Sequence, residues 1–116
     1  MSENLSKTVA QANTACGTKI TARFDTESFA GVDLFKSRVA SHARDAVGAL
    51  TTNCRDAAGK QAIAARIQRV VVRHSTSGTR LVLSEGLLTV WSDDTKSPQD
   101  AKGSNITWHN TLAELL

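Results

Sequence analysis

The chain has 116 residues, of which 41% are hydrophobic and 22% charged, and its formal net charge is +3. This length suits one domain, and the composition is that of a globular protein, not a fibre or a linker. No apolar run approaches the length needed to cross a bilayer. Residues 1–4 lack the basic start of a signal peptide, so we expect either a cytoplasmic chain or a mature form whose leader was replaced by Met1.

The distribution of charge and the cysteines bear on partners and compartment. Basic residues concentrate in residues 36–80, which hints at an anionic partner. The two cysteines, Cys16 and Cys54, lack the spacing of a zinc site, and no metal or other cofactor is expected. Two alternatives stay open for them. They are either buried thiols or a disulfide, which would add about 3–4 kcal/mol of stability and indicate an oxidising compartment.

The first half of the chain is mostly helical in pattern. Apolar residues three and four apart predict a short helix over residues 3–15, and strict alternation predicts a strand over Thr18–Phe24. A continuous apolar stripe then predicts a long helix over Val32–Asn53. After a break at residues 56–59, a shorter helix is expected from Lys60 onward.

In the second half the period changes to two. Three successive strands are predicted, over Arg69–His74, Arg80–Ser84 and Leu87–Trp91, followed by a polar loop and a last helix over residues 105–116. Together these elements predict a single α+β domain over residues 1–116. Its sheet is expected to be four-stranded and antiparallel, with one N-terminal strand plus a three-strand meander and the long helix packed on one face.

The turns of this meander predict which side chains share a face of the sheet. Closing a hairpin over Glu85-Gly86 places Arg80 opposite Trp91, and closing one around residues 75–78 places Arg73 opposite Arg80. The face away from the long helix then carries the candidate binding residues Arg23, Arg69, Arg73, Arg80 and Trp91. This face is solvated, covered by a helix or a second copy of the chain, or a site for an anionic partner, and its apolar members favour some contact.

Catalytic patterns are missing from the sequence. No nucleophile elbow, phosphate loop or metalloprotease motif occurs, and the histidines His42, His74 and His109 lie in no catalytic string. His42 is expected to be a structural residue of the long helix, and Asp93-Asp94 a solvated turn. Nucleic acid is possible but not favoured as a partner, because few aromatic residues could stack on the bases of a single strand.

A few short motifs suggest a relationship. The segment Ala49–Asp56, with its cysteine and aspartate at a helix end, is followed by Gly59-Lys60 and Val70–Val72, and Cys16-Gly17 precedes a strand. In these features the chain resembles a loosely defined group of small, uncharacterised, exported bacterial proteins. The resemblance implies no activity, but it favours a periplasmic or secreted location over a cytoplasmic one.

The sequence therefore favours a non-catalytic interaction module that binds another protein, or itself as a homodimer, through the outer face of the sheet. The alternative is an anion or nucleic-acid binder that uses Arg69, Arg73 and Arg80. A third hypothesis is a small enzyme that uses His74 in a pocket. No contact with a membrane is expected.

Overall fold

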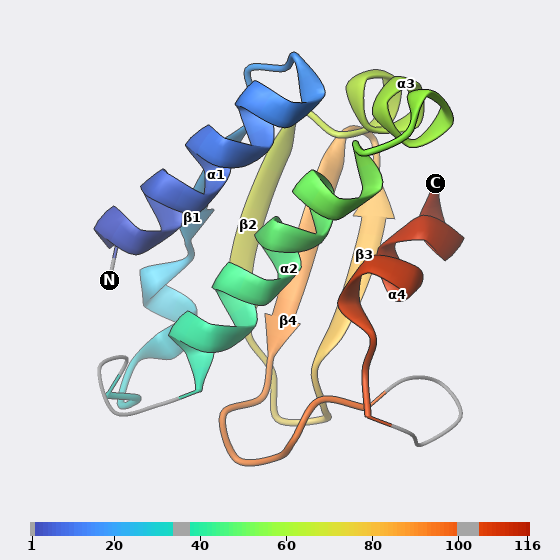
Figure 1. Ribbon diagram of the computed structural model, residues 1–116. Coiled ribbons are helices and arrows are strands. Elements are labelled where there is room, and N and C mark those ends of the chain that lie inside the picture. Colours follow the sequence, from blue (N-terminus) through green and yellow to red (C-terminus); the bar gives the residue numbers. More distant parts are fainter. Residues whose placement is uncertain (1, 34–37, 100–104) are drawn as a thin grey trace.

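A computed structural model of the chain describes residues 2–33, 38–99 and 105–116 (Figure 1). The described residues form an α+β fold with a four-stranded sheet. The helices are α1 (Ser2–Cys16), α2 (Val39–Asn53), α3 (Ala57–Arg66) and α4 (Trp108–Leu115), with a short 3-10 helix, η1 (Thr26–Phe29). The strands are β1 (Thr21–Phe24), β2 (Arg69–His74), β3 (Arg80–Ser84) and β4 (Leu87–Ser92).

The sheet is mixed, so the prediction of an antiparallel sheet with a three-strand meander is wrong. The strand order is β1-β2-β4-β3, in which β1, β2 and β4 run parallel and β3 runs antiparallel to β4. β4 therefore lies between β2 and β3. Its sequence suits this central place, because Leu88 and Val90 are fully buried on one face and Thr89 is only 7% exposed on the other.

The β3–β4 hairpin has the predicted register. Leu83 lies opposite Leu88, and Arg80 lies opposite Trp91. The two turn residues, Glu85 and Gly86, have positive φ angles of 50° and 80°. A two-residue turn of this kind matches the twist of the flanking strands and fixes their pairing.

The connection between β2 and β3 explains why these two strands do not pair with each other. The Ser75 N–H donates to the Ser92 carbonyl at 2.9 Å, which holds the start of the connection against the end of β4. Further along, the Gly78 N–H donates to the Asp93 carboxylate, and the Asp93 N–H donates to the Thr79 hydroxyl, each at 3.0 Å. The connection thus spans the width of one strand, and β4 fills that width.

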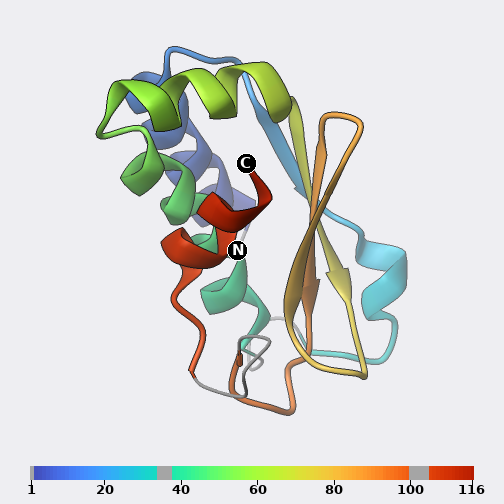
Figure 2. The same cartoon turned by 90° about the vertical axis from the view of Figure 1, so that its right-hand side faces the viewer.

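Three helices cover one face of the sheet (Figures 1 and 2). α2 packs across β4 between α1 on one side and α4 on the other, and α3 closes one end of this layer. Figure 2 shows that in the described residues no α-helix lies on the opposite face, where η1 borders one end of the sheet. The core lies between the helices and the sheet and includes Val47, Leu50, Ile63, Val70, Val72, Leu88, Val90 and Leu112.

The predicted long helix is shorter than expected. α2 begins at Val39, and Val32, the predicted start, lies in no helix. Residues 34–37 of the predicted helix lie outside the described residues. Gly31 has a φ of 82°, a left-handed conformation that a helix cannot accommodate and that glycine adopts without steric cost. The described residues after β1 form η1 and a turn at Ala30-Gly31, and Val32 and Asp33 follow this turn outside any helix.

Of the two alternatives for the cysteines, the structure has the disulfide. Cys16 and Cys54 are joined with a Cα–Cα distance of 5.3 Å, which lies within the usual range for a disulfide. The bond links the last residue of α1 to the residue that caps the end of α2. Both cysteines are buried, so the disulfide ties the two helices together inside the core.

Candidate functional site

The face of the sheet away from the helices collects all five candidate binding residues. Side chains alternate along a strand, and paired residues point to the same side in parallel and antiparallel pairs alike. From the pairings, one face, here called the outer sheet face, carries Thr21, Arg23, Arg69, Val71, Arg73, Arg80, Val82, Ser84, Leu87, Thr89 and Trp91. Arg73 and Arg80 are thus on the same face.

A row of three large side chains crosses this face. The sequence predicts Arg73 directly opposite Arg80, but in the structure both pair with Trp91, which lies between them. The correction follows from the insertion of β4 between β2 and β3. The guanidinium carbon of Arg80 lies 5.1 Å from the centre of the Trp91 ring, a cation–π contact that is typically worth about 0.5–1 kcal/mol at an exposed site.

Asp25 is a member of the site that sequence analysis missed. Its carboxylate Oδ2 lies 3.1 Å from Nε of Arg73, and both side chains are about two-thirds buried. Asp25 directly follows β1, whose last residue, Phe24, pairs with Val72. The parallel pairing of β1 and β2 therefore places Asp25 beside Arg73. The predicted antiparallel sheet does not bring these two residues together.

A hollow opens on the outer sheet face between β1, β2 and the start of β4. It has a volume of about 210 Å³, and its lining includes Arg23, Arg69, Arg73, Val71 and Leu87. Val71 is only 2% exposed, although it points away from the helices. Its neighbours around the hollow include three arginines, whose long stems can cover apolar surface while the charged ends stay in water.

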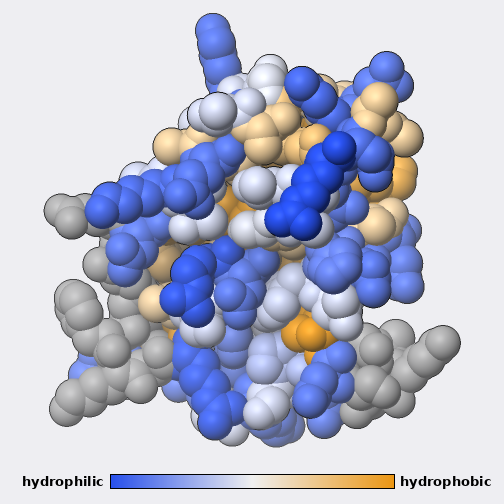
Figure 3. Space-filling model, viewed as in Figure 1, coloured by the Kyte–Doolittle hydropathy of each residue, from blue (hydrophilic) through white to orange (hydrophobic). Residues whose placement is uncertain are grey.

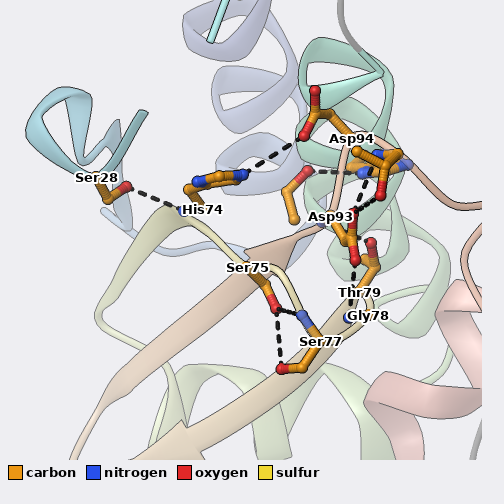
Figure 4. Close-up of polar contacts among 11 residues, drawn as sticks. Ser28, His74, Ser75, Ser77, Gly78, Thr79, Asp93 and Asp94 are labelled. Carbon is orange, nitrogen blue, oxygen red and sulfur yellow. Dashed lines mark hydrogen bonds and ion pairs between the residues drawn. The ribbon is translucent and has the colours of Figure 1, made fainter. Parts of the chain in front are cut away.

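A polar cluster lies at the edge of the sheet where β2 and β4 both end (Figure 4). The Asp93 carboxylate accepts hydrogen bonds from Gly78 N–H and from the N–H and hydroxyl of Thr95. Asp93 is only 1% exposed, so the prediction of a solvated Asp93-Asp94 turn is wrong for this residue. The hydroxyl hydrogen bond from Thr95, with the backbone hydrogen bonds, lowers the pKa of Asp93 below its ordinary value.

The two histidines of this cluster have different surroundings. His74 has Nε2 at 3.4 Å from Asp94 and its ring beside that of Phe29, while its backbone N–H donates to the Ser28 hydroxyl (Figure 4). His42 on α2 is 3% exposed, and its Nδ1 lies 2.6 Å from the Ser92 hydroxyl. Burial lowers the pKa of His42, which favours its neutral form.

The hydrogen bonds of this cluster hold separate segments of the chain together. The hydroxyl that contacts the His42 ring belongs to Ser92, which is fully buried. The cluster joins α2, the β2–β3 connection and the loop after β4 through its hydrogen bonds. His109, the third histidine, is exposed on α4.

The helical side of the molecule offers a second, wider hollow. A groove of about 610 Å³ runs over α2 between α1 and the start of α4, and Gly48, Thr52 and Trp108 contribute to its lining. Figure 3 shows this side of the molecule, where hydrophilic side chains cross the surface and separate small apolar patches.

Comparisons of the chain with protein-family models, curated protein sequences and solved structures find no match. Across residues 2–33, 38–99 and 105–116, no helix has the length and apolar character needed to cross a membrane. Within the same ranges, no group of three or more histidine, cysteine, aspartate or glutamate residues could hold a metal ion.

Proposed function

We propose that this chain is a non-catalytic interaction module that binds another protein through the outer sheet face. The observation that carries the proposal is the one-sided layering of the fold. The helices cover one face of the sheet, and in the described part of the chain no α-helix covers the other (Figure 2). A sheet with an uncovered face of mixed apolar and charged residues is suited to pairing with a second surface.

The composition of the outer sheet face supports a protein partner. Its cations are all arginines, and it contains Trp91, and both residue types are enriched where proteins bind one another. Val82 on this face is 41% exposed and is the only large hydrophobic residue classed as exposed among those described. The buried centre of a protein interface is more apolar than its rim, and arginine is enriched there.

Photo-cross-linking tests this proposal in the cells that make the protein. A benzophenone amino acid at Val82 is expected to give discrete cross-linked products, because this residue lies on the outer sheet face. The same group at Gln61, which is exposed on α3, provides the control. A product of twice the chain's mass would show that the partner is a second copy of this chain and not another protein. Equal yields of cross-linked product from both positions, or no product from Val82, would contradict the proposal.

The main alternative, an anion or nucleic-acid binder, draws support from the arginines around the hollow. Nucleic acid is the weaker form of this alternative. Trp91 is the only aromatic residue on the outer sheet face, since Phe24 points toward the helices, and one ring is a small platform for stacked bases. A nucleic-acid complex would weaken steeply with added salt and in Arg73→Glu/Arg80→Glu protein.

A third proposal, a small enzyme that uses His74, is supported only by the contact between His74 and Asp94. The buried Cys16–Cys54 disulfide supports a further proposal, that the chain works in an oxidising, extracytoplasmic compartment as the resemblance to exported bacterial proteins implies.

A further inference from the structure

Three arginines surround Val71 on the outer sheet face. Arg69 and Arg73 lie two positions before and two positions after Val71 on β2, and Arg23 pairs directly with Val71 from β1. With a rise of about 3.3 Å per residue, the Cα atoms of Arg69 and Arg73 are about 13 Å apart, and Arg23 lies beside the midpoint between them. The three side chains therefore enclose the hollow from three sides.

The positive charge of this group is only partly balanced. Asp25 forms an ion pair with Arg73. In the described part of the chain, neither an ion pair nor a side-chain hydrogen bond involves Arg23 or Arg69. Cations held close together on one surface repel one another and raise the local concentration of anions. An anionic ligand in the hollow would relieve this repulsion.

The lining narrows the chemistry of that ligand. An arginine side chain presents a planar fork of N–H donors that matches a carboxylate or a phosphate. The lining also includes the partly exposed Leu87, and the exposed Val82 lies further along the same face. A peptide that carries both carboxylates and aliphatic side chains complements this mixture better than a free phosphate does.

We infer that the hollow between Arg23, Arg69 and Arg73 binds carboxylate side chains from an acidic segment of the partner protein. The inference rests on the proposed function, because it names the chemistry of the partner that the outer sheet face takes. Arg23 and Arg69 donate hydrogen bonds to the carboxylate. Arg73, which Asp25 holds in place, closes the third side of the hollow.

The test uses a short fluorescein-labelled peptide that alternates glutamate with valine, and a counterpart with glutamine in place of glutamate. Fluorescence polarisation is expected to show binding of the glutamate peptide about tenfold tighter than binding of its counterpart, as charge-assisted hydrogen bonds require. Arg23→Gln and Arg69→Gln are each expected to weaken binding of the glutamate peptide about fivefold or more. Arg55→Gln, in the exposed turn between α2 and α3, removes the same charge elsewhere and is expected to leave binding unchanged.

Equal affinity for the two peptides would overturn the inference, and so would a loss of affinity in Arg55→Gln protein equal to that in the Arg23 and Arg69 variants. It would also be overturned if inorganic phosphate or a thymidine oligonucleotide displaced the glutamate peptide at a lower concentration than the unlabelled peptide does. Its failure is distinguishable from failure of the proposed function. Suppose that cross-linking at Val82 persists in Arg23→Gln/Arg69→Gln protein and that the two peptides bind with equal affinity. The hollow is then not a carboxylate site, but the outer sheet face is still an interface.

Discussion

Replacing Cys16 and Cys54 together by alanine is expected to lower the free energy of unfolding by about 4 kcal/mol. The two cysteines are 38 residues apart, and the disulfide removes the freedom of that loop in the unfolded chain. Such a loss is a large part of the total stability of a domain this small. Urea unfolding followed by circular dichroism measures it.

Two controls separate the bond from the packing of the sulfur atoms. Wild-type protein unfolded in the presence of a reductant keeps both sulfurs, so it is expected to show most of the same loss. Thiol titration of unfolded wild-type protein without reductant is expected to detect no free thiol. If the free energy of unfolding of the double variant lies within about 1 kcal/mol of the wild-type value, the unfolded chain gains little freedom when the bond is lost. That result would contradict the loop-closure argument.

Two glycines in helices are expected to respond in opposite directions to replacement by alanine. Gly59 lies in the first turn of α3, and its N–H donates to the Asp56 side chain that caps the helix, at 2.7 Å. A methyl group on Gly59 would overlap the backbone carbonyl of Asn53 at the end of α2. Because backbone cannot move aside without disturbing the α2–α3 turn, Gly59→Ala is expected to cost about 2–3 kcal/mol.

Gly48 provides the matched control. It lies in the middle of α2, and a methyl group there would meet no atom within 4 Å. Alanine loses less backbone freedom on folding than glycine, so Gly48→Ala is expected to stabilise the protein by about 0.5–1 kcal/mol. Thermal unfolding of both variants measures the contrast, and a Gly59→Ala protein as stable as Gly48→Ala would show that α3 does not approach α2 as described.

The composition of each sheet face could be predicted from the sequence although the order of the strands could not. The turn at Glu85-Gly86 fixes the β3–β4 register locally. The neighbour of β2, by contrast, depends on contacts between residues distant in the sequence. Because side chains alternate in parallel and antiparallel strands alike, the wrong neighbour for β2 still left Arg73 and Arg80 on one face.

The features that sequence analysis missed depend on long-range polar contacts. Asp93 lies in a segment of turn-forming residues, and its burial comes from the Gly78 N–H of a distant connection. Asp25 acquires its role through the parallel β1–β2 pairing. The apolar stripe from Val32 is compatible with a helix, and no glycine or proline between Val32 and Val39 signals the later start of α2.

The two tryptophans allow a direct test of where a partner binds. They are the only tryptophans in the chain: Trp91 lies on the outer sheet face, and Trp108 lines the groove on the helical side. Trp108→Phe protein therefore reports through Trp91 alone, and Trp91→Phe protein through Trp108 alone. Both are titrated with the unlabelled glutamate–valine peptide while tryptophan emission is recorded.

If the outer sheet face is the binding surface, the peptide changes the emission of Trp91 in a saturable manner and leaves that of Trp108 constant. A saturable change at Trp108 with none at Trp91 would place binding on the helical side and contradict the account.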